Sequence, residues 1–128
     1  MENRKVLADT SLLIDYLRNA DKHNSQFIQL FKNHNLHISV ISVFELLNGA
    51  TTESKMSDIN KLCKNLGIID FNLPCAEKAS EIYRELKRRN KMIEFRDILI
   101  GATALVHDIP IATLNVKHFE RISGIQII

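Results

Sequence analysis

The sequence predicts an α/β fold in which a central, mainly parallel β-sheet is flanked by α-helices. Two observations predict it: short apolar runs of strand length recur along the chain, and longer runs with helical spacing separate them. Strands that alternate with helices are joined by crossovers, which make neighbouring strands parallel. No repeat, low-complexity tract or Pro/Gly-rich linker divides the 128 residues, so we expect one domain over residues 1–128 with a core of its own.

The first half of the chain contains two strand candidates, Val6–Ala8 and Leu36–Val40. Four segments carry apolar residues at helical spacing. Their apolar faces consist of Leu12, Leu13, Tyr16 and Leu17; Phe27, Ile28, Leu30 and Phe31; Val43, Leu46, Leu47 and Ala50; and Ile59, Leu62, Cys63 and Leu66. We expect the second helix to end near Asn35 and the fourth to be stopped by Gly67 in the C′ position.

The second half of the chain continues the alternation. Three short strands are expected, at Gly67–Phe71, Pro110–Ala112 and Ile125–Ile128. Pro74 should open a long helix at its first position, where no backbone N–H is needed. Its expected apolar line is Ala76, Ala79, Tyr83 and Leu86. A further helix runs from about Asp97 to Val106, and its small residues should let a neighbouring element approach closely. These small residues are Gly101, Ala102 and Ala104.

Composition and charge describe a globular chain with a mildly basic balance. The apolar fraction is 45% and the charged fraction 25%. The net charge of +2 and the pI near 8.6 are compatible with a nucleic-acid partner without requiring one. No apolar run approaches the roughly 18 residues of a membrane span. The opening MENRKV also lacks the features of a secretory signal. We therefore expect a cytoplasmic protein with no membrane contact.

The cysteines and histidines give no metal-binding pattern. Cys63 and Cys75 are the only cysteines and do not form a CxxC pair, so we expect reduced thiols rather than a disulfide. His34 and His37 have a spacing that could suit a metal, but no cysteine or third histidine lies nearby. A solvated loop is expected there.

Three acidic residues stand at or near the start of expected helices, and each has two interpretations. Asp9 follows the apolar strand and could cap the next helix. Glu45 lies three residues after Ser42, which is the spacing of a capping box, and Asp97 could cap the helix in RDILIGATALV. Alternatively, the three carboxylates bind a cation.

The cost of buried charge favours the cation for Asp9, because an acid after a buried strand must be paired or bound. Arg96 could pair with Asp97, but no basic residue is close in sequence to Asp9 or Glu45. If the three acids converge, mutual repulsion would raise their pKa values, and a hard cation such as Mg²⁺ or Mn²⁺ would remove that conflict. In parallel sheets, ligands bind beyond the carboxyl ends of the strands, which is where Asp9 is expected. The acids are far apart along the chain, so their residues alone leave both interpretations open.

Four stretches, in order, resemble the four successive motifs of PIN-domain ribonucleases, and most closely those of VapC toxins from toxin–antitoxin pairs. They are LADTSLLIDYL, ISVISVFELLNG, FRDILIGATA and IPIATLNVKHFERI, and together they span nearly the whole chain. The resemblance implies a PIN-like fold with a parallel sheet, an acidic pocket that binds Mg²⁺ or Mn²⁺, and RNA as the substrate. It also implies a VapB-like antitoxin as partner and a homodimer.

The resemblance assigns roles to the three acids. Asp9, Glu45 and Asp97 match the metal-binding acids of the first, second and third motifs. As a catalytic set they would hydrolyse a phosphodiester bond with the help of the metal, since such an ion activates water and neutralises charge on phosphate. Asp9 and Asp97 would bind the metal directly, while Glu45 would hold a ligand water or help to orient the attacking one.

The fourth motif departs from the usual family pattern in two places. Asn115 stands where many family members carry a fourth acid, and His118 where relatives often have Asp. Asn115 can still offer one oxygen to a metal, but it contributes no charge. Thr113 matches the small hydroxyl residue of the motif. Thr113, Thr10 and Ser11 are expected to orient the carboxylates, although hydroxyls are also common in the first turn of a helix.

A basic run consisting of Lys87, Arg88, Arg89 and Lys91 precedes Asp97. It could bind RNA phosphates and lead them to the acidic pocket. Alternatively, it is a solvated helix C-terminus, where cations complement the helix dipole.

Two other functions were weighed against the nuclease. A phosphorylation receiver domain would need an acceptor Asp at a strand end near the middle of the chain, but residues 51–58 (TTESKMSD) are typical of loop and helix. A catalytically silent PIN-fold protein that binds RNA or a protein partner has the same motifs, so only activity distinguishes it from a nuclease.

Overall fold

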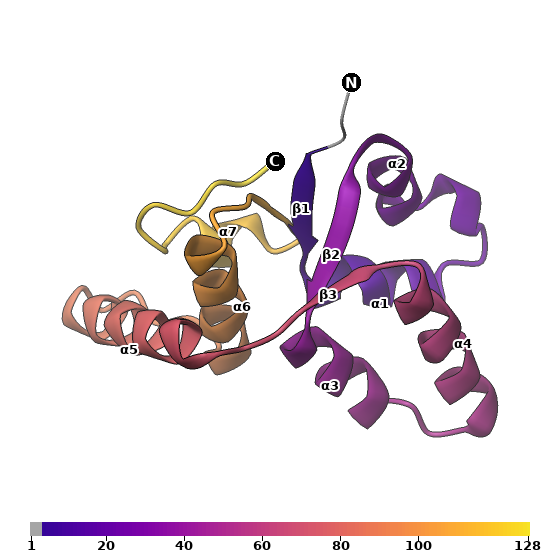
Figure 1. The fold of residues 1–128 in the computed structure, drawn as a ribbon, viewed down its shortest axis with the longest axis horizontal. Helices are drawn as coiled ribbons and strands as arrows, with labels where there is room; N and C mark the ends of the chain where they lie inside the picture. The colour runs from indigo at the N-terminus through magenta and orange to yellow at the C-terminus, as the bar shows by residue number, and fades with distance from the viewer. Residues whose placement is uncertain (1–3) are drawn as a thin grey trace.

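A four-stranded parallel sheet runs through the middle of the structure, a computed structural model that describes residues 4–128 (Figure 1). The strands are β1 (Lys5–Ala8), β2 (Asn35–Ser39), β3 (Gly67–Ile69) and β4 (Ile111–Ala112), in the order β3-β2-β1-β4. The helices are α1 (Thr10–Arg18), the 3-10 helix η1 (Lys22–Asn24), α2 (Gln26–Asn33), α3 (Val40–Asn48), α4 (Glu53–Lys64), α5 (Leu73–Arg88), α6 (Phe95–Val106) and α7 (Val116–Phe119). The predicted α/β class with a parallel sheet is confirmed.

The central strand β1 separates two apolar cores, because its side chains alternate between the faces of the sheet. Val6 and Ala8 belong to the core beneath α1, α2 and α4, whereas Leu7 belongs to the core beneath α5 and α6. Figure 1 shows α1, α2 and α4 on one side of the strands and α5, α6 and α7 on the other. All three side chains have no exposed surface, so this part of β1 is enclosed by its neighbours, whereas Lys5 at its start is exposed.

The register of the strands brings the segments that follow them to one edge of the sheet. Val6 pairs with Leu36 of β2, and Ala8 pairs with Ala112 of β4. The backbone N–H of Asp9 donates to the carbonyl of Ala112 at 2.9 Å. Residues directly after β1, β2 and β4 therefore share the carboxyl edge, where parallel α/β sheets place their ligands.

Several expected boundaries were wrong by one or two residues, because local capping decides where each helix begins. Ser39 accepts a hydrogen bond from the backbone N–H of Ile41 at 3.0 Å and caps α3, so Val40 starts a helix instead of ending a strand. Asn35 begins β2, two residues after the end of α2. Pro74 occupies the second position of α5, because Asn72 is the N-cap.

Gly67 was assigned the wrong role, since α4 ends at Lys64 and is capped by Asn65. Gly67 is instead the first residue of β3 and pairs with His37 of β2. A Cβ at Gly67 would collide with the His37 ring, so glycine serves a close approach here. His37 itself lies in a strand, which corrects the solvated loop expected around it.

The buried face of α5 and the end of the chain also differ from expectation. Leu86 and Ala79 are buried as predicted, but Tyr83 and Ala76 are exposed, and the buried line instead includes Cys75 and Ile82. The C-terminal residues do not form a strand of their own: one bridge joins Ile127 to Ile111.

Close packing of α6 was predicted correctly. Gly101, Ala102 and Ala104 are buried, and a Cβ on Gly101 would meet the side chain of Ile122. The thiols of Cys63 and Cys75 are both free; Cys75 is fully buried. Within residues 4–128, no helix combines the length and apolar character needed to cross a bilayer.

Candidate active site

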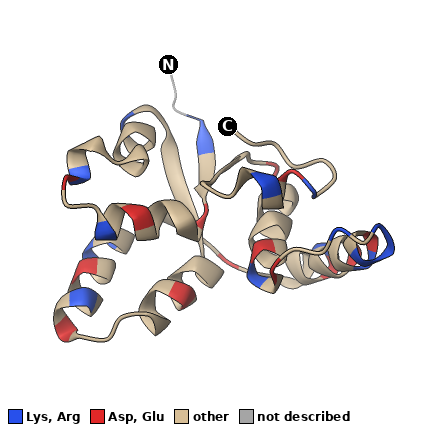
Figure 2. Ribbon diagram, turned by 180° about the vertical axis from the view of Figure 1, so that it is seen from behind, with Lys and Arg blue, Asp and Glu red and all other residues tan. Residues whose placement is uncertain are grey.

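An open pocket of about 600 Å³ lies at the carboxyl edge of the sheet, between α1, α3 and α6. Its lining includes Asp9, Glu45, Asp97 and Asn115, which come from four separate segments of the sequence. Figure 2 shows Asp and Glu segments near the middle of the molecule, at the end of β1, in α3 and near the start of α6. The fold therefore brings together the four predicted metal-binding residues.

The carboxylate of Asp9 is held by two hydroxyl groups rather than by the backbone N–H groups of the helix that follows it. It occupies the N-cap position of α1, but its side chain makes no capping hydrogen bond, so the cap interpretation is wrong. The hydroxyls of Ser11 and Thr113 both donate to its Oδ2, each at 2.7 Å. Within residues 4–128 no donor reaches Oδ1. Asp9 is only 2% exposed, so its orientation is fixed while one oxygen remains available.

Glu45 is part of a short hydroxyl relay and of an ion pair. The Thr10 hydroxyl donates to Glu45 Oε1 at 2.8 Å and lies 2.7 Å from the hydroxyl of Ser42. Because Thr10 has one hydroxyl proton, Ser42 must donate to Thr10. The other oxygen, Oε2, is 3.1 Å from Nε of Arg96. The expected capping box is therefore wrong: Ser39 caps α3, and Glu45 faces the pocket instead.

Asp97 lies in the first turn of α6, whose N-cap position is held by Glu94. The cap interpretation is wrong for this acid too. Its Oδ2 is 3.0 Å from Nδ1 of His118, the residue that departs from the usual family pattern. Asp97 is 5% exposed. The pairing with Asp97 that was open to Arg96 is not observed, because Arg96 pairs with Glu45 and Glu94.

The loop after β4 carries Asn115, the fourth of the predicted metal-binding residues. Thr113 donates to Asp9 and also accepts a hydrogen bond from the backbone N–H of Asn115 at 2.8 Å. Ser11 reaches the same loop, since its hydroxyl accepts from the backbone N–H of Leu114 at 3.1 Å. Ser11, Thr113 and Thr10 thus each contact a carboxylate of the pocket, as the sequence predicted for these hydroxyls.

Burial and neighbouring charges disfavour the ionised form of two of the three carboxyl groups. Burial raises the pKa of Glu45 above its usual range, and the negative charges of Asp9 and Asp97 add to that increase. Burial also raises the pKa of Asp97, again with a contribution from Asp9, while the contact with His118 opposes it. The shared influence of Asp9 on both groups shows that the three charges lie within electrostatic reach of one another.

The donor set suits a hard divalent cation. Three carboxylates and one amide supply oxygen ligands, which Mg²⁺ and Mn²⁺ prefer, and a cation would offset the burial and the repulsion that raise the two pKa values. Across residues 4–128, no three His, Cys, Asp or Glu side chains already stand in a metal-binding cluster. Each acid is instead oriented by donors of its own chain.

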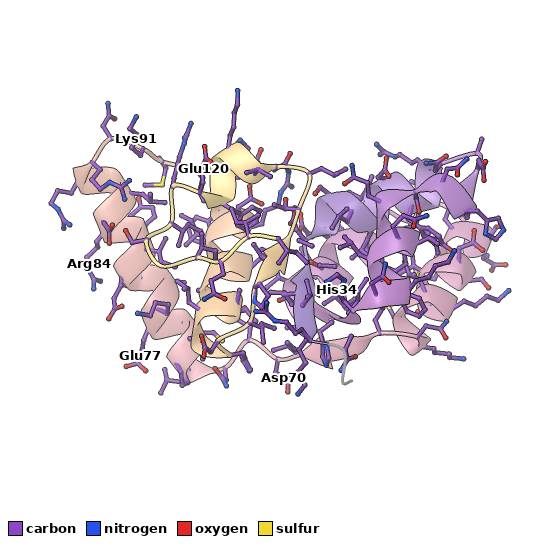
Figure 3. All side chains as sticks on the ribbon, turned by 90° about the horizontal axis from the view of Figure 1, so that it is seen from above. His34, Asp70, Glu77, Arg84, Lys91 and Glu120 are labelled. Atoms are coloured by element: carbon purple, nitrogen blue, oxygen red, sulfur yellow. The ribbon has the colours of Figure 1, made fainter. Side chains whose placement is uncertain are left out.

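The predicted basic run lies away from the pocket. Figure 3 labels Lys91 at the outer end of α5, and none of the four residues lines the pocket. All are exposed, and Arg89 pairs with Glu85 at 3.0 Å on the same helix. This placement matches the solvated helix terminus; RNA binding at this end stays a prediction.

Sequence reasoning missed the pairing of Arg96 with Glu45 and the support of Thr10 by Ser42. Both depend on α3 lying beside the starts of α1 and α6, which no local pattern indicates. The signal available was spacing: Arg96 stands directly before Asp97, and Ser42 lies one helical turn before Glu45.

The fold and the acidic pocket define a class of protein. The family model of the PIN domain matches residues 6–125, so the chain belongs to the PIN-domain family. Its relatives narrow this further: the chain is similar to VapC ribonucleases. It is 31% identical to ribonuclease VapC1 of Methanocaldococcus jannaschii over 94% of this chain and 83% of the relative. It is 32% identical to ribonuclease VapC10 of Mycobacterium tuberculosis over 89% of this chain and 85% of the relative.

Solved structures agree with these relatives. The chain superposes on the DNA-bound VapBC structure from Salmonella typhimurium with a TM-score of 0.85 and 26% identity, covering 100% of this chain and 98% of the other. For VapBC2 from Rickettsia felis, bound to a fragment of its promoter, the TM-score is 0.84 with 25% identity and 97% coverage of each chain. The predicted PIN-like fold and VapC-type resemblance are confirmed.

Proposed function

We propose that this protein is a metal-dependent endoribonuclease that hydrolyses RNA phosphodiester bonds at the acidic pocket and acts as the toxin of a VapBC-type pair. The observation that supports it most directly is the convergence of Asp9, Glu45 and Asp97 in one pocket, in a chain similar to VapC ribonucleases over most of its length. These acids are separated by tens of residues in sequence, and simple helix capping does not explain any of them.

The residues of the pocket have two roles, as metal ligands and as hydroxyl groups that orient those ligands. Asp9 and Asp97 would hold a Mg²⁺ or Mn²⁺ ion, with Glu45 and Asn115 completing the oxygen set. Such an ion, when bound, activates water for attack and neutralises charge on the phosphate. Ser11 and Thr113 fix Asp9 through its Oδ2, so the carboxylate cannot rotate away. Thr10 orients Glu45 through Oε1.

A VapB-like antitoxin is the proposed protein partner, and an apolar groove beside the active site offers it a place to bind. This groove, of about 220 Å³, lies between α1, α3 and α4 and is lined by Leu17, Leu46, Ile59 and neighbouring residues. Glu45 lines both the groove and the acidic pocket. A segment bound in the groove would therefore end at the active site, where it could block access of RNA. The relatives crystallised as VapBC complexes support such a partner.

A homodimer is also proposed. The apolar side chains of the first two helices offer it little surface, because Leu13 and Phe27 are buried in the monomer core and Phe31 is 40% exposed. The larger exposed apolar side chains, Phe44 and Phe95, lie at the pocket instead, at 66% and 68% exposure. Large exposed aromatic side chains are typical of interfaces. A dimer formed there would bring two pockets together.

Cleavage of total cellular RNA by the purified protein tests the nuclease. With Mg²⁺ or Mn²⁺ present, RNA should be cut, and EDTA should stop the reaction. Asp9→Asn should remove activity, because it removes a ligand charge while keeping the shape of the side chain. Asp15→Asn is the matched control, since Asp15 lies in α1 but does not line the pocket.

Full activity in Asp9→Asn would contradict the assignment of the pocket. Absence of cleavage by the unmodified protein, together with binding of RNA or of an antitoxin, would identify a catalytically silent PIN-fold protein instead.

A further inference from the structure

Arg96 occupies a position that the proposed nuclease chemistry does not use. Among the described residues that line the acidic pocket, it is the one Lys or Arg. Its Nε lies 3.1 Å from Oε2 of Glu45, and its Nη2 lies 2.7 Å from Oε2 of Glu94. The guanidinium group of Arg96 is therefore ion-paired with Glu45, one of the oxygen ligands that suit a divalent cation.

The ion pair between Arg96 and Glu45 is weak enough to exchange. The Arg96 side chain is 57% exposed, and the Glu94 side chain is 55% exposed, so water screens both contacts. Ion pairs that water reaches are weak. Glu45, by contrast, is 16% exposed and is held on its other oxygen by Thr10. When a cation binds, Glu45 stays in place and Arg96 is the partner free to move.

We propose that Arg96 is an exchangeable counter-ion of the active site: it neutralises Glu45 while the pocket holds no metal and moves to a phosphate of the RNA when a divalent cation takes Glu45. This inference rests on the proposed nuclease function. It adds a role for a residue of this chain that determines both how tightly metal binds and how well substrate binds.

The chemistry of arginine favours this exchange. A planar guanidinium presents a fork of N–H donors that matches the oxygens of a phosphate as well as those of a carboxylate. Arg96 is directly next to Asp97 in the first turn of α6, so a guanidinium released from Glu45 remains at the mouth of the same pocket. The freed side chain loses one anionic partner and gains another, which keeps the cost of the exchange small.

Two effects of opposite direction are expected from Arg96→Gln. Mn²⁺ binding to the free protein, measured by titration calorimetry without RNA, should tighten about two- to fivefold, because the competing cation is gone. The KM for total cellular RNA should rise about fivefold or more, because a charge-assisted contact to phosphate is lost. Damage to the fold would weaken the binding of Mn²⁺ as well as the binding of RNA. Tighter Mn²⁺ binding together with a higher KM therefore distinguishes the exchange from a structural role of Arg96.

Two further variants sharpen the test. Arg96→Lys keeps the charge but loses the fork, so Mn²⁺ affinity should stay near that of the unmodified protein while KM still rises in part. Arg84→Gln on α5 removes the same charge from an exposed site that does not line the pocket, and it should change neither quantity.

Equal Mn²⁺ affinity of Arg96→Gln and the unmodified protein would overturn the exchange, and so would an unchanged KM. Absence of any Mn²⁺ binding by the unmodified protein would overturn the proposed nuclease function itself, and the counter-ion with it.

Discussion

The acidic pocket and the basic end of α5 are two concentrations of charge built in opposite ways. The acids Asp9, Glu45 and Asp97 come from distant segments, are largely buried, and each has a specific partner from elsewhere in the chain. The basic residues are adjacent in sequence and exposed, and the ion pair of Arg89 is with Glu85, one turn away. A run of charge is produced by the sequence, whereas a convergent cluster is produced only by the fold.

The difference has an energetic consequence. Buried carboxylates close to one another cost folding free energy, which a fold tolerates only where something else requires the charges. Exposed cations on a helix terminus cost almost nothing and contribute little beyond a favourable interaction with the helix dipole. The pocket is therefore the stronger indication of function, although the basic run is the easier of the two to see in the sequence.

The largest effect should come from removing a buried charge. Asp97→Asn should lower RNA cleavage more than about 100-fold, since even indirect supports of metal ligands cost 10- to 100-fold. In EDTA at neutral pH its melting temperature should be equal to or higher than that of the unmodified protein. Burial raises the pKa of Asp97 in the folded state, so the ionised form opposes folding.

The size of this stability effect depends on pH. The cost of the Asp97 charge is absent below the ordinary pKa of the carboxyl group and is fully present above its raised folded value. Any gain in stability of Asp97→Asn should accordingly fade as the solution is made acidic. Undiminished cleavage, or a clearly lower melting temperature at neutral pH, would contradict this view of the pocket.

A smaller effect is expected from Thr113→Val, which keeps the shape of the side chain and removes its hydroxyl. Asp9 would lose one of its two donors, and the backbone N–H of Asn115 would lose its acceptor. Activity or Mn²⁺ affinity should fall about 10- to 100-fold, and stability by about 1 kcal/mol. Thr51→Val, in the exposed connection between α3 and α4, is the matched control for kinetics and melts. Normal activity would show that Ser11 alone can orient Asp9.

The smallest effect should follow from changes at the basic end of α5. The double change Lys87→Gln and Arg88→Gln should weaken RNA binding at most about fivefold at low salt, and the difference should vanish at high salt. Lys61→Gln with Lys64→Gln, in the last turn of α4, removes the same charge elsewhere. Filter binding at several salt concentrations measures this. A loss greater than tenfold for the α5 pair alone would make that end a principal RNA surface and reverse the ranking of the two regions.

Much of this arrangement was predictable because it depends on local patterns. Strand-length apolar runs placed Asp9 at the carboxyl end of β1, and the match of four motifs linked it to Glu45, Asp97 and Asn115. The hydroxyl of Thr113 was predicted as a support because it stands two residues before Asn115 in the fourth motif. These inferences require only the order of elements along the chain.

What could not be predicted depends on how side chains meet across elements. The sequence left a pairing of Arg96 with its neighbour Asp97 open, yet α3 brings Glu45 to 3.1 Å from the guanidinium. Gly67 has the spacing of a helix stop, but its requirement for a missing Cβ comes from His37 on the adjacent strand. The buried face of α5 differs from the predicted one because the position of α6 decides which residues of α5 face inward.

The hydrogen bond from Thr113 to Asp9 joins residues separated by 104 positions. Because β4 pairs with β1, this hydrogen bond to Asp9 cannot form until β4 and the loop after it have been synthesised. Proteins are synthesised from the N-terminus. A chain emerging from the ribosome thus carries Asp9 and Glu45 without a completed site until Thr113 has been added. Its own translation machinery is rich in RNA, and the order of segments delays the assembly of the pocket until β4 and the loop after it have been made.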